Sequence, residues 1–92
     1  MKLQIFTVYD RAAKVFQQPS YVINQDVMLR IMRNCINTPD HNYALNPSDY
    51  VLYHLGEFDD TDASIDYKME KITSLDSIIP DKVKMQLENK ST

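Results

Sequence analysis

Glycine and cysteine are nearly missing from this chain of 92 residues, which contains one of each, Gly56 and Cys35. A loop that binds phosphate through its backbone amides needs several glycines close together, so we do not expect a nucleotide-hydrolysing site. One cysteine cannot form an internal disulfide, and together with His41 and His54 it provides too few ligands for a typical zinc site. The sequence therefore predicts no bound metal and no cofactor.

Long hydrophobic runs are missing as well. No apolar segment approaches the roughly 20 residues that a helix needs to span a bilayer. The first residues, Met1 to Leu3, lead directly into alternating polar and apolar positions instead of a signal peptide. We expect a soluble, intracellular protein with no membrane partner.

Positive charge is scarce. The net charge is −3, and residues 51–92 carry five Lys and Arg against nine Asp and Glu, whereas residues 1–50 carry five against four. Proteins that bind nucleic acid mainly through its phosphates present a strongly basic surface. Any contact with DNA must therefore use a local patch, and the acidic second half would suit a basic protein partner or simply solubility.

The remaining composition is that of an ordinary folded protein, with 43% apolar and 25% charged residues. A chain this short buries only about 60 to 65% of its unfolded surface, so its core is thin and self-association would stabilise it. Residues 1–79 are predicted to form one α+β domain. Residues 80–92 have too little apolar content to form a firm element, and we expect a weakly ordered C-terminal tail there.

The first part of the chain predicts a β-hairpin. Lys2 to Asp10 alternates, and its β-branched and aromatic residues occur at positions of both faces, so both faces should be at least partly covered. A turn at Arg11 to Lys14 leads into Val15 and Phe16. Pro19 then ends the hydrogen-bonded ladder or confines it to an edge.

An amphipathic helix is predicted from Gln25 to Asn37. Asn24 can cap its free amides, and Asp26 lies favourably in the first turn. Thr38 and Pro39 stop the helix, and the polar stretch to residue 46 is predicted to be a loop. The stripe that should face the core contains Val27, Met28, Ile31, Met32, Cys35 and Ile36.

A second hairpin follows. Tyr50 to Phe58 is apolar at alternate positions of both faces and predicts a central strand whose neighbours cover both sides, with Phe58 on the same face as His54. Gly56 indicates a bulge or a close backbone approach. Ile65 to Ile72 predicts a last strand that is solvated on one face. The predicted fold is therefore a small single α+β domain of order β-β-α-β-β, with a mainly antiparallel sheet and one amphipathic helix packed on a face.

No arrangement of residues predicts catalysis. His54, on an otherwise apolar strand, should be a hydrogen-bonded core or interface residue, whereas His41 should be solvated in a loop. The acidic run 59–62 lacks the glycine and the bidentate glutamate of an EF-hand loop and is interpreted as a turn. Cys35 lies on the apolar side of the predicted helix, where a small buried thiol is the usual outcome. We expect a protein that is not an enzyme.

The polar side of the predicted helix is the candidate nucleic-acid-binding surface. The residues that could present donors to a phosphate backbone are Arg30, Arg33, Asn34 and Asn37, joined by Arg11 and Lys14. Six tyrosines could add platforms on which the bases of single-stranded nucleic acid stack. A plainer interpretation stays open, in which Arg30 pairs with Asp26 on a solvated helix face and the tyrosines pack within the sheet.

Several short motifs between Ile5 and Ile72 resemble one viral family. They are Val8-Tyr9-Asp10 with Ala13, Pro19, Arg30 before Asn37, and the block from Pro47-Ser48-Asp49-Tyr50 to Gly56-Glu57-Phe58-Asp59. With these motifs the chain resembles the small non-structural protein of gokushoviruses, the microvirus branch of single-stranded DNA phages. Members often carry a glycine in the turn after the acidic pair, where this chain has Asp62-Ala63-Ser64, so we expect that turn to differ.

The resemblance implies a non-capsid protein of the host bacterial cytoplasm. Such proteins are described as DNA-binding or replication-associated and are compared with the microvirus factor that switches replication toward single-strand synthesis and packaging. Our first hypothesis is a non-enzymatic protein that acts on single-stranded DNA or on viral replication or packaging proteins. The alternative is a homo-oligomeric adaptor that docks a viral or host protein without contacting DNA, for example through an exposed edge strand.

Overall fold

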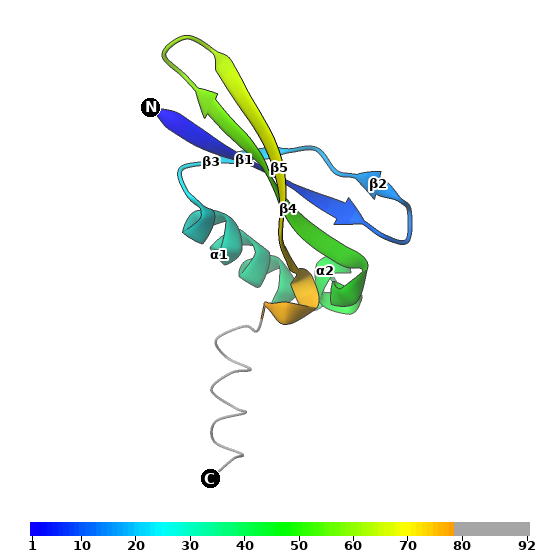
Figure 1. Ribbon diagram of the computed structural model, residues 1–92. Coiled ribbons are helices and arrows are strands. Elements are labelled where there is room, and N and C mark those ends of the chain that lie inside the picture. The colour runs from blue at the N-terminus through cyan, green and yellow to red at the C-terminus, as the bar shows by residue number, and fades with distance from the viewer. Residues whose placement is uncertain (79–92) are drawn as a thin grey trace.

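The computed structural model describes residues 1–78, so the predicted tail at 80–92 lies outside the described residues. The strands are β1 (Lys2–Asp10), β2 (Val15–Phe16), β3 (Ser20–Val22), β4 (Tyr50–Asp59) and β5 (Ser64–Ser74), and the helices are α1 (Gln25–Ile36) and α2 (Asn42–Leu45). Two short 3-10 turns, η1 (Pro47–Asp49) and η2 (Leu75–Ser77), flank the second hairpin (Figure 1). Within this range no helix combines the length and the apolar character needed to cross a membrane.

The strands form one curled antiparallel sheet in the order β2-β1-β4-β5, with β3 also paired to β1. β1 pairs with β4 along its whole length, from Lys2 opposite Asp59 to Asp10 opposite Tyr50, so β4 is central as predicted. The antiparallel sheet and its packed helix are confirmed, but the order β-β-α-β-β is too simple. Pro19 separates the two-residue β2 from a third strand, β3, which pairs with the other half of β1 and was not predicted.

The helix α1 begins and ends close to the predicted positions. The Asn24 side chain accepts a hydrogen bond from the Val27 amide at 2.9 Å, and Asp26 lies in the first turn, where a negative charge is favourable. Met28 and Met32 are buried against the sheet, whereas Ile31, which belonged to the predicted apolar stripe, is 39% exposed. The helix therefore contacts the core along a narrower stripe than its sequence indicates.

The predicted loop before residue 46 contains a second helix, α2, so that prediction was wrong. His41 is half-buried and caps the helix, because its Nδ1 accepts a hydrogen bond from the Tyr43 amide at 3.1 Å. The buried Tyr43 ring lies 4.6 Å from the Tyr50 ring, and its hydroxyl donates to the Gln17 side-chain oxygen. Burial raises the pKa of Tyr43 to about 12. α2 has only four residues, too few to show a helical period.

The core lies between α1 and one face of the sheet, which we call the covered face (Figure 1). Phe6 and Leu52, from the two central strands, are at most 1% exposed on this face. After β5 the chain returns beneath the sheet, where Leu75 and Ile78 complete the core. The members of the buried cluster are Phe6, Val8, Met28, Met32, Tyr43, Tyr50, Leu52, Leu75 and Ile78.

A bulge at Gly56 changes which side chains share a face. Gly56 has a φ of +137°, and a Cβ atom there would lie 2.0 Å from the Asp66 carbonyl oxygen, so only glycine fits. The register of β4 against both neighbours shifts at this point, which confirms the predicted bulge. Because of the extra residue, Phe58 and His54 lie on opposite faces, although the alternating pattern predicts the same face.

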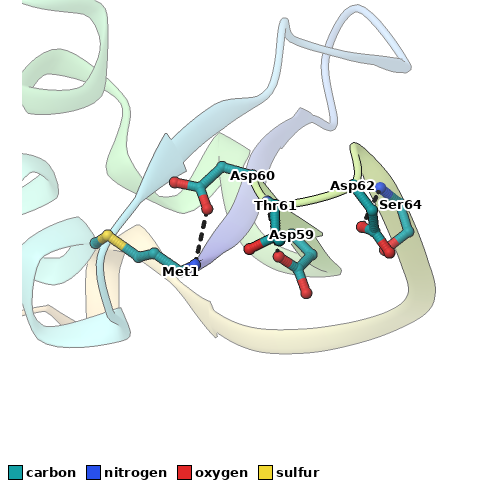
Figure 2. Close-up of polar contacts among 6 residues, drawn as sticks. All are labelled: Met1, Asp59, Asp60, Thr61, Asp62 and Ser64. Carbon is teal, nitrogen blue, oxygen red and sulfur yellow. Dashed lines mark hydrogen bonds and ion pairs between the residues drawn. The ribbon is translucent and has the colours of Figure 1, made fainter.

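The turn between β4 and β5 is held by its own acidic residues (Figure 2). Asp59 and Asp62 accept hydrogen bonds at 3.0 Å from the amides of Thr61 and Ser64. Hydrogen bonding to Thr61, mainly its backbone, lowers the pKa of Asp59, and hydrogen bonding to the Ser64 side chain and backbone lowers the pKa of Asp62. Asp60 instead pairs with the N-terminal ammonium at 2.7 Å. The acidic run is thus a structured turn, and Ala63 within it has a φ of +62°, a conformation that glycine would adopt without strain.

Candidate nucleic-acid interface

The face of the sheet opposite the buried cluster carries a second set of apolar side chains. We call this the open face. Residues directly opposite each other in an antiparallel ladder point to the same side, so the open face follows from the register. It contains Leu3, Ile5, Thr7 and Tyr9 of β1, Phe16 and Tyr21 of the outer strands, Val51, Tyr53 and Phe58 of β4, and Ile65, Tyr67 and Lys71 of β5. Leu55 and Met69 lie at a register shift and are assigned to the same face because they line one pocket with Thr7, Phe16 and Tyr67.

Aromatic rings dominate the open face. Phe16 lies 4.6 Å from the Tyr9 ring and 5.6 Å from the Tyr53 ring, measured between centroids. Tyr21 meets Phe58 edge to face at 5.8 Å, so the outer strand β3 and the central strand β4 hold a second pair. Phe16, Tyr21 and Tyr67 remain 46, 50 and 66% exposed. Neighbouring rings contact Phe16 and Tyr21, and all three residues keep a large part of their surface in solvent.

The curled sheet makes part of this face a groove of about 320 Å³. Thr7 is a buried polar residue of the groove, and its hydroxyl donates a hydrogen bond to the Gln17 carbonyl at 2.6 Å. That bond ties β1 to the connection between β2 and β3. The lining comes from β1, β2, this connection and the second hairpin, and consists of Thr7, Phe16, Gln17, Pro19, Leu55, Tyr67 and Met69. The groove can therefore receive a flat apolar group between facing side chains.

Charge is divided between the two sides of the β4–β5 hairpin. Lys71 pairs with Tyr53 and is exposed. Among the paired strand positions of residues 1–78, it is the charged residue on the open face. On the other side, Glu57 faces Asp66 and forms an ion pair with Lys2 at 3.7 Å. A shallow acidic depression on that side is lined by Lys2, Glu57, Asp59, Ser64 and Asp66. A polyanion would thus meet repulsion on one side of the hairpin and a lysine on the other.

Within residues 1–78, most of the polar side of α1 is exposed to solvent. Arg30, Asn34 and Asn37 are exposed and Arg33 is half-buried. Within residues 1–78 neither arginine forms an ion pair, so the predicted pair between Arg30 and Asp26 is not present. The guanidinium groups are therefore not occupied by carboxylates of the described part of the chain.

Arg11 and Lys14 lie elsewhere, in the turn between β1 and β2. The Arg11 guanidinium donates to the Ser48 carbonyl at 3.0 Å, and its amide donates to the Asp49 carbonyl at 2.8 Å. Figure 1 shows this turn at the far end of β1, away from the start of α1. The six predicted binding residues thus form two separate groups, and Arg11 already serves to fasten the turn to η1.

Two other residues singled out by the sequence have structural contacts. His54 Nε2 lies 2.8 Å from the Gln4 side-chain oxygen, and its ring lies 4.9 Å from that of Phe6, which confirms the predicted hydrogen-bonded histidine. Cys35 is half-buried against the core, and burial raises the pKa of its thiol. A raised pKa leaves less thiolate at neutral pH, which argues against a nucleophilic role.

Sequence reasoning proposed the six tyrosines as stacking platforms, but it did not bring Tyr21 and Tyr67 together with Phe16 on one face of the sheet. The strand from Ile65 to Ile72 was predicted to be solvated on one face only, and this was wrong, because residues 64–71 are exposed on both faces. The signal that could have found the open face is the shortage of covering elements: α1 can cover one face of the sheet, and within residues 1–78 no equally long helix is present for the other.

Comparisons with known proteins agree with a phage origin. The model of the family described as Phage ORF5 protein matches residues 3–78, which is nearly the whole described domain. No curated protein and no solved structure shows a significant match to the chain. The extent of the family match, covering both hairpins and the helix, shows that this chain belongs to the Phage ORF5 protein family.

Proposed function

We propose that this protein is a non-enzymatic phage protein of genome replication, or of the switch to single-stranded DNA synthesis and packaging, and that it binds single-stranded DNA on the open face. The observation that carries the proposal is the set of exposed rings, Phe16, Tyr21 and Tyr67, on a grooved sheet face. Membership of a phage family provides the biological setting.

The chemistry of the open face suits unpaired bases. Every base has an aromatic surface, so stacking on protein rings tolerates any sequence and contributes about 1 to 3 kcal/mol per base. Lys71 lies beside these rings and can contact a phosphate, while the acidic side of the hairpin is turned away. Because positive charge is scarce here, stacking supplies most of the affinity in this proposal, and the salt dependence of binding should be shallow.

The test is a titration of labelled oligothymidine with the protein at low and at physiological salt, followed by fluorescence anisotropy. Phe16→Ala should weaken binding about tenfold or more, because it removes one stacking platform. Lys71→Glu should weaken binding and make it less sensitive to salt. Leu45→Ala is the matched control, since Leu45 is 61% exposed but lies outside the open face.

A second pair of changes distinguishes the open face from the helix. Arg30→Glu combined with Arg33→Glu should leave the affinity within about threefold of the parent protein if the bases stack on the open face. Loss of binding in this double variant, with Phe16→Ala unaffected, would move the DNA site to the polar side of α1. Absence of binding at both salt concentrations would remove the direct DNA mechanism altogether.

The alternative function is that of a homo-oligomeric adaptor which docks a viral or host protein without contacting DNA. The acidic depression that includes Glu57, Asp59 and Asp66 supports it, because such a surface suits a basic protein and repels nucleic acid. Self-association of the purified protein, together with no affinity for oligothymidine, would favour the adaptor over the DNA-binding protein.

A further inference from the structure

The two edges of the sheet are protected to different degrees. One edge is formed by β2 and β3, which have two and three residues and are separated by Pro19. The other edge is β5, an unbroken strand of 11 residues without proline. Residues 64–71 are all exposed, and within residues 1–78 no strand lies on the outer side of β5. Such an edge presents unpaired backbone amides and carbonyls that another strand can bind.

We propose that two copies of this chain pair through β5, edge to edge and antiparallel, about a two-fold axis that passes through Tyr67. The result is one continuous sheet across both copies. A two-fold contact requires a surface that complements itself, and the sequence of β5 meets this condition in one register.

Charge complementarity selects that register. With the axis at Tyr67, Asp66 of one copy faces Lys68 of the second copy, and by symmetry the same pair forms twice. On the other face, Ile65 of one copy lies opposite Met69 of the second copy, so apolar side chains meet apolar ones.

The neighbouring registers are poorer. An axis at Lys68 would place the two Lys68 side chains opposite each other and would pair Asp66 with Glu70, so like charges would meet. An axis at Met69 would pair Lys68 with Glu70, but it would also bring the half-buried residues 72–74 into the contact. If the two strands slid by one residue from the proposed pairing, apolar side chains of one copy would lie opposite charged side chains of the other. The axis at Tyr67 keeps all paired residues within the exposed part of the strand.

The geometry has a consequence for the open faces. Residues that pair across antiparallel strands point to the same side, so the open faces of the two copies would lie side by side on one surface of the extended sheet. A contact through one strand is small by the standard of stable dimers, and we expect a dissociation constant on the order of micromolar.

Charge exchange provides the first test, read by sedimentation equilibrium in the absence of DNA. Asp66→Lys alone and Lys68→Asp alone each turn both ion pairs into like-charge pairs, and each should raise the dimer dissociation constant about tenfold or more. An equimolar mixture of the two variants should recover the dimer, because both pairs become complementary again. Asp40→Lys makes the same charge change at an exposed loop residue and should have no effect.

These variants are expected to fold. Asp66 faces Glu57 within its own chain, so Asp66→Lys replaces a like-charge pair with an opposite one. Circular dichroism of each variant checks this point. If the parent protein is strictly monomeric at micromolar concentration, the proposal is overturned. It is also overturned if Asp66→Lys dimerises normally while Lys68→Asp does not, because that result indicates a two-fold axis at Met69.

Cross-linking provides a second, independent readout in a Cys35→Ser background. Tyr67→Cys places the new thiol on the proposed axis, directly opposite its own copy, so mild oxidation should give a disulfide-linked dimer. Met69→Cys is the matched control, because it lies on the same face two residues away and should not cross-link. The reverse result would overturn the register. Neither experiment involves DNA, so failure of the dimer and failure of the proposed function are distinguishable.

Discussion

The covered and open faces of the sheet are built from the same two central strands, yet their aromatic side chains are buried to different extents. On the covered face Phe6 and Leu52 are at most 1% exposed beneath α1. On the open face Thr7 is also buried, beside the β2–β3 connection, whereas Tyr53 is half-buried next to Phe16. Alternation along a strand therefore reveals that two apolar faces exist, whereas the path of α1 decides which face holds the main buried cluster.

The largest effect is expected on the covered face. Leu52→Ala would leave a cavity at a side chain that is fully buried between β4 and the helix, so the free energy of unfolding should fall by about 4 kcal/mol. Urea denaturation followed by circular dichroism measures this. Leu45→Ala, at a residue 61% exposed, should change the stability by less than about 0.5 kcal/mol. If both variants lost the same free energy of unfolding, the assignment of Leu52 to the core and Leu45 to the surface would be contradicted.

Gly56→Ala tests the bulge that assigns Phe58 to the open face. The new Cβ would collide with the Asp66 carbonyl and the backbone φ of +137° is unfavourable for alanine, so we expect a loss of about 3 kcal/mol. The matched change in the opposite direction is Ala63→Gly, at a φ of +62°, which should leave stability unchanged or raise it by up to about 1 kcal/mol. Parent-like stability of Gly56→Ala would contradict the bulge.

Raising the pH should loosen the covered face through Tyr43. Its folded-state pKa of about 12 lies above the ordinary value of 10, so the neutral hydroxyl stabilises the fold fully below pH 10 and this contribution is lost as the pH rises from 10 to about 12. We expect at most about 2 kcal/mol, measured as a fall in the melting temperature.

Tyr43→Phe serves as the control for this pH dependence. The variant lacks the ionisable group, so its melting temperature should fall less steeply over the same window. The pKa values of Tyr50 and Cys35 are also raised by burial, and both groups add losses of the same sign as the pH increases. An identical pH profile in parent and variant would show that the Tyr43 hydroxyl does not titrate with the fold.

The smallest loss of stability is expected on the open face. Phe16→Ala removes ring contacts with Tyr9 and Tyr53 at a side chain that is already 46% exposed, so unfolding should become easier by only about 1 kcal/mol. Chemical denaturation measures the loss, and Phe16→Leu, which keeps most of the apolar area, is the conservative comparison. A loss as large as that of Leu52→Ala would mean that the open face belongs to the core.

Much of the fold could be predicted because its determinants are local. Asn24 caps α1 through a bond to an amide three residues away, and Pro39 limits the other end of the helix. Gly56 indicated the bulge because it is the one glycine in the chain. Each of these signals acts within a few residues, so the sequence alone is enough to read it.

The rest depends on contacts between distant residues. β3 and α2 have three and four residues, and they are held by pairing with β1 and by the contacts of Tyr43 with Tyr50 and Gln17. The candidate site was predicted on the polar side of α1, where arginines are visible in the sequence. The tyrosines were already candidates for base stacking, but their position beside Phe16 on one face became apparent only from the strand register and from the side on which α1 packs.

The acidic depression beside Glu57, Asp59 and Asp66 has a consequence for how a nucleic acid would approach. Repulsion between like charges extends for about 10 Å at moderate ionic strength, well beyond contact distance. An arriving strand would be deflected from that flank and turned toward the aromatic groove before touching the protein. Because wrongly oriented strands are repelled, a larger share of the collisions would bring the nucleic acid to the open face. This orientation would not require many cationic side chains.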